Sequence, residues 1–443
     1  MPFEICNKYC KMSIENIAQK AKKASIHLAA VSTEQKNKAL ESLAIALFER
    51  KSEIEIANTK DIENSEKNNV SAPLLKRLKF DEAKISEVVE GIRSLILLSD
   101  PVGETLKATE LDKGLELYRV SCPIGLIGVI FESRPDALVQ ISSLCLKSGN
   151  AVMLKGGSEA QYTNRILADI IDQATVKSGI PEGWIQLIET RSQVNEMLSL
   201  DQYIDLIIPR GSNEFVKYIM DNSNIPVLGH ADGICHQYID SEADIEMAVN
   251  IVTDSKTQYC AVCNALETLL VNKDIAPKFL PELKKALDAK NVELRGCVNT
   301  RKIVNVKEAT EEDWKTEYLD YILSIKIVNN VDEAINHINT YGSGHTDAIV
   351  TQNSKTADLF MNLVDTGNAF WNCSTRFSDG FRYGLGAEVG VSTNKIHARG
   401  PVGLDGLMIY KWKLKGKGHI VADYASGSKK YTHEPLNKKF SVS

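Results

Sequence analysis

Cys263 is a candidate nucleophile. Polar residues precede it in the segment 256–268, and a strand-like run, residues 268–271, follows it. We therefore expect the thiol to lie in a loop between two elements, where reactive groups are commonly presented. Such a thiol becomes a nucleophile if a helix end or a cation lowers its pKa. The alternative is a buried cysteine that packs as a small apolar side chain.

Cys260 and Cys263 also form a C-x-x-C pair. Such a pair could be a thioredoxin-like redox site, or half of a zinc site completed by Cys235, His230 or His236. The sequence has no second C-x-x-C pair and no spaced histidine pair to support either alternative. We therefore expect no bound metal.

Two glycine-bearing turns could bind an anion. Lys155-Gly156-Gly157-Ser158-Glu159 and Arg210-Gly211-Ser212 each follow a strand-like run and open a helical stretch. The N–H groups at a helix start point outward and the helix dipole favours negative charge, so a dinucleotide phosphate would fit either turn. Alternatively, glycine merely permits a tight turn. Neither turn matches the G-x-G-x-x-G fingerprint or the P-loop, which argues against an ordinary Rossmann or ATPase site.

Three later segments combine glycine, serine and arginine: residues 372–380, 385–390 and 395–401. A guanidinium fork matches the geometry of carboxylate and phosphate, so these segments favour a loop that binds an anionic substrate. A solvated loop with unpaired arginines is the alternative.

The elements that would position these residues alternate between strands and helices. Residues 1–100 are mostly helical, with a capping box at Ser32 and Gln35 and apolar stripes at helical spacing. From Gly125 onward, strands are expected at residues 126–131, 151–154, 185–188 and 204–208, with a helix at 136–148. This alternation indicates a parallel sheet covered on both faces, so we predict a doubly wound α/β domain.

A second α/β unit is expected from about Asp254 to Gly400. The tail, residues 407–422, is rich in lysine and partly alternates, which is typical of an exposed strand seeking a partner edge. We predict a subunit contact there.

Composition excludes several classes of protein. Lys and Arg total 52 against 58 Asp and Glu, a formal charge of -6, so neither nucleic acid nor an anionic membrane surface is an expected partner. No apolar run reaches the roughly 18 residues that a spanning helix needs.

The first residues lack the order of a signal peptide, and the nine cysteines are scattered, so we expect reduced thiols and a cytoplasmic protein. A chain of 443 residues predicts two or three domains.

Four segments in order resemble the aldehyde dehydrogenase superfamily: residues 123–135, 146–160, 262–268 and 384–403, the last with a His-Ala-Arg-Gly-Pro signature. Within it, the resemblance is to the branch that reduces γ-glutamyl phosphate, and it spans nearly the whole chain. The resemblance implies NADPH-dependent reduction of L-glutamyl 5-phosphate to L-glutamate 5-semialdehyde, with release of phosphate, in proline biosynthesis. It implies a thioester intermediate on Cys263.

The resemblance also implies roles for other residues. Lys155 and Gly156 would contact the cofactor, Lys155 at the adenosine ribose, and Gly157 with Ser158 would leave room for a 2′-phosphate, hence NADPH. The remaining implied contacts are Gly211, Ser212 and Glu317 for the cofactor, the last at the nicotinamide ribose, and Arg134, Asn264 and Arg376 for the substrate.

Two departures from the superfamily pattern bear on mechanism. Hydrolytic members carry a glutamate before a Leu-Gly-Gly turn that activates water, whereas residues 227–230 here read Val-Leu-Gly-His. The missing base suits a reductase, because water would destroy its thioester. The superfamily's oxyanion-stabilising asparagine is replaced around residues 133–135, which leaves the Cys263 N–H as the natural contributor.

The resemblance implies an NADP(H)-binding domain at residues 1–254, a catalytic domain at 255–405 and a tail, 406–443, in an oligomerisation hairpin. We expect a homo-oligomer that could associate with the glutamate 5-kinase that makes its labile substrate. Two alternatives stay open: a hydrolytic NAD(P)-dependent semialdehyde dehydrogenase, and a non-catalytic dinucleotide- or metal-binding protein.

Overall fold

The computed structural model describes residues 13–70, 72–132, 134–190 and 192–441. The chain divides into two compact units. The first comprises Met1–Gly211, Ile219–Val227 and Gly403–Ser443, and the second comprises Ser212–Tyr218 and Leu228–Val402. All seven cysteines within the described residues are free. No helix of the described part is both long and apolar enough to cross a membrane.

The first unit contains a parallel sheet in the order β5-β4-β3-β6. Its strands are β3 (Leu126–Phe131), β4 (Ala151–Lys155), β5 (Ile185–Ile188) and β6 (Leu206–Arg210). Every residue of β3 and β5 is buried, because a parallel strand covered on both faces requires a continuous apolar run. The predicted strands are confirmed, except that β6 begins two residues later than expected.

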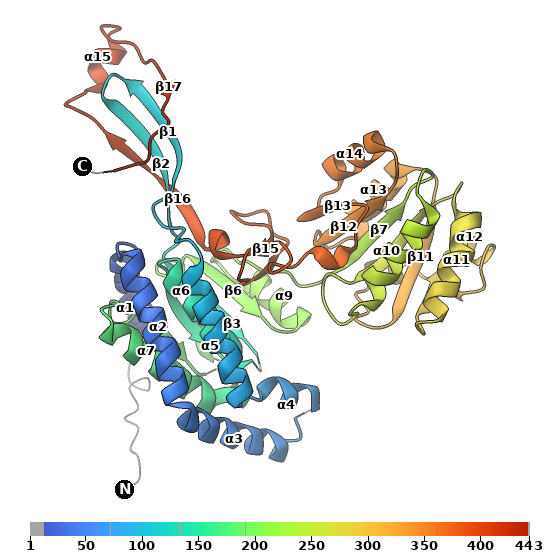
Figure 1. Cartoon of the computed structure of the whole chain (residues 1–443), viewed down its shortest axis with the longest axis horizontal. Helices are drawn as coiled ribbons and strands as arrows, with labels where there is room; N and C mark the ends of the chain where they lie inside the picture. The colour runs from blue at the N-terminus through green and yellow to red at the C-terminus, as the bar shows by residue number, and fades with distance from the viewer. Residues whose placement is uncertain (1–12, 71, 133, 191, 442–443) are drawn as a thin grey trace. The chain divides into compact units, whose positions relative to one another are not determined.

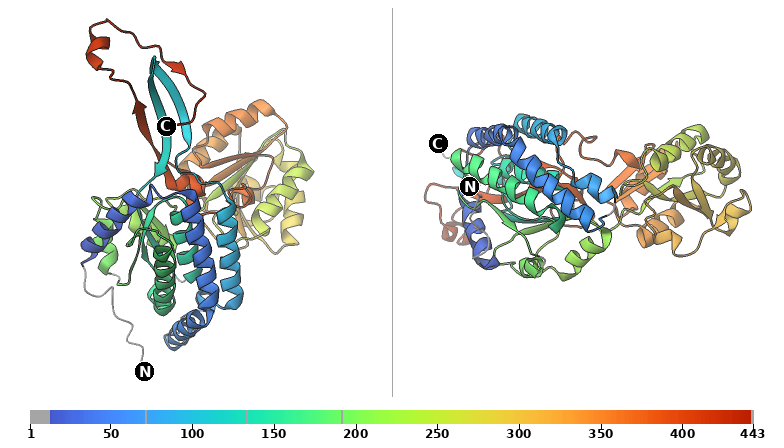
Figure 2. Two further views of the ribbon diagram at one scale, coloured as in Figure 1. Left: turned by 60° about the vertical axis from the view of Figure 1, so that its left-hand side comes forward. Right: turned by 90° about the horizontal axis from the view of Figure 1, so that it is seen from below.

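Helices cover both faces of this sheet (Figure 2). Helix α1 (Ile14–Leu28) packs on β3, β4 and β5, while α6 (Pro135–Lys147) and α7 (Gln161–Lys177) pack on the other side. Helix α2 (Thr33–Glu49) packs on α6 and α7, and begins where predicted, with the Ser32 side chain accepting from the Gln35 N–H. The other helices of this unit are α3 (Lys51–Lys67), α4 (Ala72–Leu78), α5 (Glu82–Leu97) and α8 (Ser192–Leu198). Helix α9 (Asn213–Asn222) is divided between the two units.

The same unit holds an antiparallel sheet that the sequence only partly predicted. Its order is β16-β2-β1-β17, from β1 (Thr105–Asp112), β2 (Leu115–Pro123), β16 (Met408–Lys415) and β17 (Glu434–Pro435) (Figure 1). The expected tail strand is β16, and it pairs along its whole length with β2 of the same chain. The backbone hydrogen-bonding groups along one edge of the tail strand are therefore paired within the chain.

The second unit is built on a parallel sheet of seven strands, in the order β10-β9-β11-β8-β7-β12-β13. They are β7 (Cys235–Ile239), β8 (Leu266–Asn272), β9 (Glu293–Gly296), β10 (Lys307–Glu308), β11 (Ile322–Val328), β12 (Thr346–Val350) and β13 (Asn368–Trp371). This unit begins before the expected Asp254, which lies inside α10 (Ile245–Thr257), because β7 already belongs to its sheet.

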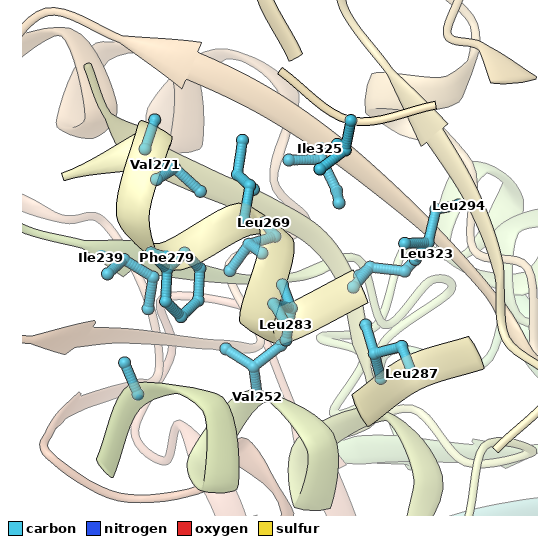
Figure 3. Close-up of a cluster of buried hydrophobic side chains, with 14 of the residues drawn as sticks. Ile239, Val252, Leu269, Val271, Phe279, Leu283, Leu287, Leu294, Leu323 and Ile325 are labelled. Carbon is cyan, nitrogen blue, oxygen red and sulfur yellow. The ribbon is translucent and has the colours of Figure 1, made fainter. Parts of the chain in front are cut away.

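Alternate residues of these strands face two separate cores. Leu269 and Val271 of β8 pack with α10 and α11 (Ala276–Asp288), as Figure 3 shows, whereas Leu270 packs with α13 (Val331–Tyr341) and α14 (Ser354–Leu363). Apolar side chains thus fill both faces of the central strands, which leaves the ends of those strands as places where polar side chains can gather. The remaining short elements are α12 (Val298–Arg301), β14 (Gly390–Ser392), β15 (Gly400–Val402) and α15 (Val421–Ala425).

Candidate active site

The candidate site lies at the amino ends of the seven-stranded sheet. His230 and Gly233 precede β7, Cys263 precedes β8, Glu317 precedes β11 and His345 precedes β12. Since these strands are parallel and the first residues of β7 and β8 are paired, the segments that enter them meet at one edge. Residues far apart in the sequence are gathered here by the sheet.

Cys263 lies half-buried in a turn between α10 and β8, as the sequence predicted. Gly233 packs directly against its backbone: a Cβ on Gly233 would lie 2.1 Å from the Cys263 carbonyl oxygen and 2.5 Å from its Cα. The same carbonyl accepts a hydrogen bond from Cys235 Sγ at 3.1 Å. Burial raises the pKa of the Cys235 thiol well above its usual range, so Cys235 stays protonated and can donate. The turn of Cys263 is therefore held by two residues from the β7 segment.

The loop that carries Arg376 is hydrogen-bonded to the turn that carries Cys263. Thr375 Oγ1 donates to the Asn264 carbonyl at 2.8 Å, and Asn264 Nδ2 donates to the Ser378 carbonyl at 2.7 Å. Arg376 itself is 8% exposed, and its Nε donates to Gln258 Oε1 at 2.9 Å. The loop that carries the guanidinium is thus tied to residues on both sides of Cys263.

The charge of Arg376 acts on Cys263. Burial lowers the pKa of Arg376 and the nearby Arg382 lowers it further, while Asp379 and then Cys263 raise it. The two groups are therefore close enough to interact electrostatically, and a guanidinium stays charged at any physiological pH. A cation beside the thiol is the condition under which a cysteine becomes a nucleophile.

Glu317 is joined to the same edge. Its carboxylate accepts from Asn213 Nδ2 at 2.5 Å and from the N–H of Gly233, the residue that packs on Cys263. Burial raises the pKa of Glu317. Asn213 is the first residue of α9 and follows Ser212, so the turn that carries Ser212 lies at this carboxylate.

A buried ion pair lies behind Glu317. Lys256 Nζ and Glu267 Oε2 are 2.6 Å apart, with both side chains fully buried. The second oxygen of Glu267 accepts the N–H of Leu319 at 3.3 Å. Leu319 has a φ of 53°, a conformation that a bulky side chain adopts only when its surroundings impose it. The pair therefore fixes the backbone next to Glu317.

Two histidines complete the edge. His230 Nδ1 lies 3.0 Å from the Val391 carbonyl, and His345 Nδ1 lies 2.8 Å from Thr346 Oγ1. Burial, and then the neighbouring His230, lower the pKa of His345 well below its usual range, so its ring is neutral. Sequence reasoning considered His230 only as a zinc ligand and missed His345 and Gly233, because nothing in their local sequence relates them to Cys263.

The remaining predicted residues lie in the first unit, at the carboxyl ends of its parallel sheet. The turns after β4 and β6 carry Lys155, Gly156, Gly157, Ser158 and Gly211, and Arg134 stands at the start of α6 after β3. Strand β3 lies between β4 and β6, so the strand order reverses there, and such a reversal is where doubly wound sheets bind dinucleotides.

The first of these turns is tightly enclosed. A Cβ on Gly156 would lie 2.1 Å from Asn164 Nδ2, and one on Gly157 would lie 2.0 Å from a carboxylate oxygen of Glu159. Arg134 is about half exposed and pairs with Asp136 at 3.0 Å. Its neighbour Ser133, part of the segment in which the oxyanion asparagine is replaced, lies outside the described residues.

The predicted site residues therefore fall into two groups. Ser212, Cys263, Asn264, Glu317 and Arg376 meet at the amino edge of the seven-stranded sheet. The other group, at the carboxyl edge of the four-stranded sheet, comprises Arg134, Lys155, Gly156, Gly157, Ser158 and Gly211. The first group offers a nucleophile with a cation, and the second offers turns that suit an anion.

Comparison with known proteins places this arrangement in a family. A model of the aldehyde dehydrogenase family matches residues 6–299. A γ-glutamyl phosphate reductase from Acetivibrio thermocellus is 70% identical over 97% of this chain and 100% of its own length, and one from Pelotomaculum thermopropionicum is 67% identical over 97% and 99%. The crystal structure of a γ-glutamyl phosphate reductase from Thermotoga maritima superposes with a TM-score of 0.90 at 42% identity, covering 92% of this chain and 100% of that one.

The chain therefore belongs to the aldehyde dehydrogenase family and, within it, groups with the γ-glutamyl phosphate reductases. It is an oxidoreductase, and the predicted aldehyde dehydrogenase-like α/β fold is confirmed.

Proposed function

We propose that this chain reduces L-glutamyl 5-phosphate to L-glutamate 5-semialdehyde with NADPH and releases inorganic phosphate, a step of proline biosynthesis. The observation that carries the proposal is a half-buried cysteine whose turn is hydrogen-bonded to the loop of a buried arginine, in a chain so similar to curated γ-glutamyl phosphate reductases. An acyl phosphate needs a strong nucleophile at its carbonyl carbon and positive charge for its leaving group.

Cys263 would act as the nucleophile. Its thiolate attacks the acyl carbon, the bond from that carbon to the phosphate oxygen breaks, and phosphate leaves a thioester on the sulfur. When bound, NADPH supplies the hydride that converts this thioester into a thiohemiacetal, which collapses to the aldehyde and the free thiol. The Cys263 N–H stabilises the oxyanion formed in the attack.

Arg376 would bind an anionic group of the substrate and favour the thiolate form of Cys263. Asn264 contributes by tying the Arg376 loop to the nucleophile's turn. We assign Arg134 to a second anionic group, since a half-exposed guanidinium that pairs with one aspartate can exchange it for a ligand.

The turns of the first unit suit the cofactor. Gly156 lies against the Asn164 side chain and Gly157 against the Glu159 carboxylate, and neither glycine places a side chain between its own backbone and a ligand. We propose that Lys155 binds the adenosine ribose and that Ser158 lies beside the 2′-phosphate of NADPH. Gly211 and Ser212 would lie along the cofactor, and Glu317 would accept hydrogen bonds from the nicotinamide ribose.

We also propose that the chain forms a homo-oligomer through β16. One face of this strand carries Tyr410, Trp412 and Leu414, which are 51%, 53% and 59% exposed, while its lysines lie on the opposite face. A labile acyl phosphate would favour association of this oligomer with the kinase that supplies it.

The experiment that tests the proposal runs the reaction backward, because the acyl phosphate is unstable. Purified protein receives glutamate 5-semialdehyde and NADP⁺, with or without inorganic phosphate, and NADPH formation is followed. Steady turnover should require phosphate, and Cys263→Ala should lower its rate by at least about 1,000-fold while NADP⁺ binding persists. Cys373→Ala, which removes another half-buried thiol of the same unit, is the control. Retained activity in Cys263→Ala would contradict the mechanism, and turnover without phosphate would favour the hydrolytic alternative.

A further inference from the structure

Cys263 shares its surroundings with two histidines in a way that the proposed reaction does not use. One potential ligand atom from each of His230, Cys263 and His345 lies within 4.8 Å of the other two. The two imidazole rings meet edge to face, with centroids 5.0 Å apart. Among the described residues, no other group of three or more histidine, cysteine, aspartate and glutamate side chains has this spacing.

The Nδ1 contact of His230 fixes its tautomer. A carbonyl can only accept, so the 3.0 Å contact between His230 Nδ1 and the Val391 carbonyl places the proton on Nδ1 and the lone pair on Nε2. Metal-binding histidines are commonly fixed by such a bond from the remote nitrogen.

His345 gives an independent indication that a ligand binds here. Its side chain is 1% exposed, its Nδ1 is engaged by Thr346 Oγ1, and its Nε2 has no hydrogen-bond partner in the described part of the chain. A buried polar nitrogen without a partner costs free energy, which a ligand can recover.

The donor set selects the ion. One thiolate and two imidazoles suit Zn²⁺, whereas Mg²⁺ and Ca²⁺ require oxygen ligands. Around tetrahedral zinc, ligand atoms at about 2.0–2.3 Å from the metal stand roughly 3.3–3.8 Å apart, so the group must close by only about 1 Å.

We propose that Zn²⁺ binds to Cys263, His230 and His345 and reversibly blocks the nucleophile. The Cys263 S–H bond releases its proton to solvent, the sulfur bonds to the metal, and the bound thiolate can no longer attack an acyl carbon. The inhibitory consequence rests on the proposed function, but the binding of zinc does not.

The first test measures zinc binding directly. ZnCl₂ is titrated into the full-length protein against a chromophoric chelator, in phosphate-free buffer, for the wild type, His345→Asn and His230→Asn. We expect one zinc per wild-type chain and affinity at least about tenfold weaker in both variants. His27→Asn, which changes an exposed histidine on α1, should bind like the wild type. Because buried His345 could be needed for folding, half-buried His230 keeps the test decisive.

Two results would overturn the inference. One is unchanged zinc affinity in both histidine variants. The other is loss of zinc in Cys260→Ser with retention in both histidine variants, which would place the ion on the C-x-x-C pair instead.

A second test asks whether zinc covers the nucleophile. Iodoacetamide labelling of Cys263 is followed by mass spectrometry in a Cys297→Ser background. Burial alone would raise the pKa of Cys297, but N–H groups of residues 299, 300 and 327 and the Thr300 hydroxyl lower it, so this thiol would compete for the reagent. Zinc should slow labelling of Cys263, EDTA should restore it, and His345→Asn should abolish the protection.

Neither assay needs turnover. A protein that binds zinc but fails to oxidise the semialdehyde would refute only the proposed function. One that turns over but binds no zinc would refute only this inference.

Discussion

At the scale of single residues, the site depends on how closely the chain can approach Cys263. Gly233 has an ordinary backbone conformation, so it is required for space rather than for flexibility: it donates its N–H to Glu317 and packs on the Cys263 backbone. The carboxylate that we propose for the cofactor and the proposed nucleophile are thereby linked through one residue. A side chain at position 233 would disturb both.

We predict that Gly233→Ala lowers kcat by about 100-fold or more, because a displacement of about 1 Å at a reacting atom has effects of this size. The added Cβ would lie 2.1 Å from the Cys263 carbonyl oxygen, and the backbone must move to relieve the clash. Steady-state rates of phosphate-dependent NADPH formation measure the effect.

The matched control is Gly91→Ala in α5, where a Cβ meets nothing within 4 Å. This change should leave kcat unaltered and stabilise the fold by about 0.4–1 kcal/mol. A Gly233→Ala enzyme with the wild-type rate would show that the contact does not position Cys263.

Residue-scale prediction from the sequence was uneven for a physical reason. Cys263 and Arg376 belong to motifs that can be recognised from the neighbouring residues in the sequence. The structure brings the two residues together. Gly233 and His345 have no local signature, since their relation to Cys263 exists only once β7, β8 and β12 are aligned in one sheet.

At the scale of elements, the buried pair of Lys256 and Glu267 joins the end of α10 to β8 and holds the segment before β11. Burial raises the pKa of Glu267 to about 7, and Lys256 opposes that rise. The pair therefore stabilises the ionised carboxylate only while both partners are present.

We predict that Lys256→Met is destabilising and increasingly so as the pH rises above 7. Without Lys256, the folded-state pKa of Glu267 rises further above its unfolded value near 4.5. A group with a raised folded pKa loses its contribution to stability as pH rises through that pKa, by at most about 1.4 kcal/mol per pH unit. Urea unfolding at pH 6, 7 and 8.5 measures the difference from the wild type.

Lys256→Met/Glu267→Leu supplies the comparison. Removing both charges should cost less at pH 8.5 than removing the lysine alone and should show no such pH dependence. A destabilisation by Lys256→Met that is the same at all three pH values would contradict this account of the pair.

Element prediction succeeded where local pattern and burial agree. The continuous apolar runs at Leu126–Phe131 and Ile185–Ile188 are strands with the expected bounds. The β1–β2 hairpin was not predicted, although its two strands are neighbours in the sequence; only the tail strand that pairs with the other edge of β2 was expected. The second unit's start was expected too late, because no recognisable boundary signal precedes β7 in the sequence.

At the scale of the whole molecule, each unit presents one edge of a parallel sheet for function. The four-stranded sheet offers its carboxyl ends and the seven-stranded sheet its amino ends. The strands of the antiparallel sheet belong to neither parallel sheet, and assembly is the role that we propose for it.

We predict that Trp412→Lys on β16 converts an oligomer into a smaller species, because it places a charge among exposed apolar side chains. Size-exclusion chromatography with light scattering measures the mass. Ile56→Lys, at a 73% exposed position on α3, should leave the mass unchanged. A wild-type protein that is monomeric at micromolar concentration would refute the assembly proposal.

The central claim, a thioester on Cys263 that water cannot efficiently discharge, is tested most directly by a single-turnover measurement without phosphate. Protein is mixed rapidly with NADP⁺ and glutamate 5-semialdehyde, and NADPH is followed together with the mass of the peptide that contains Cys263. The account predicts a burst of one NADPH per chain, a glutamyl group on Cys263, and resumed turnover only when phosphate is added. Steady NADPH formation without phosphate, or a burst with no acyl group on Cys263, would contradict it.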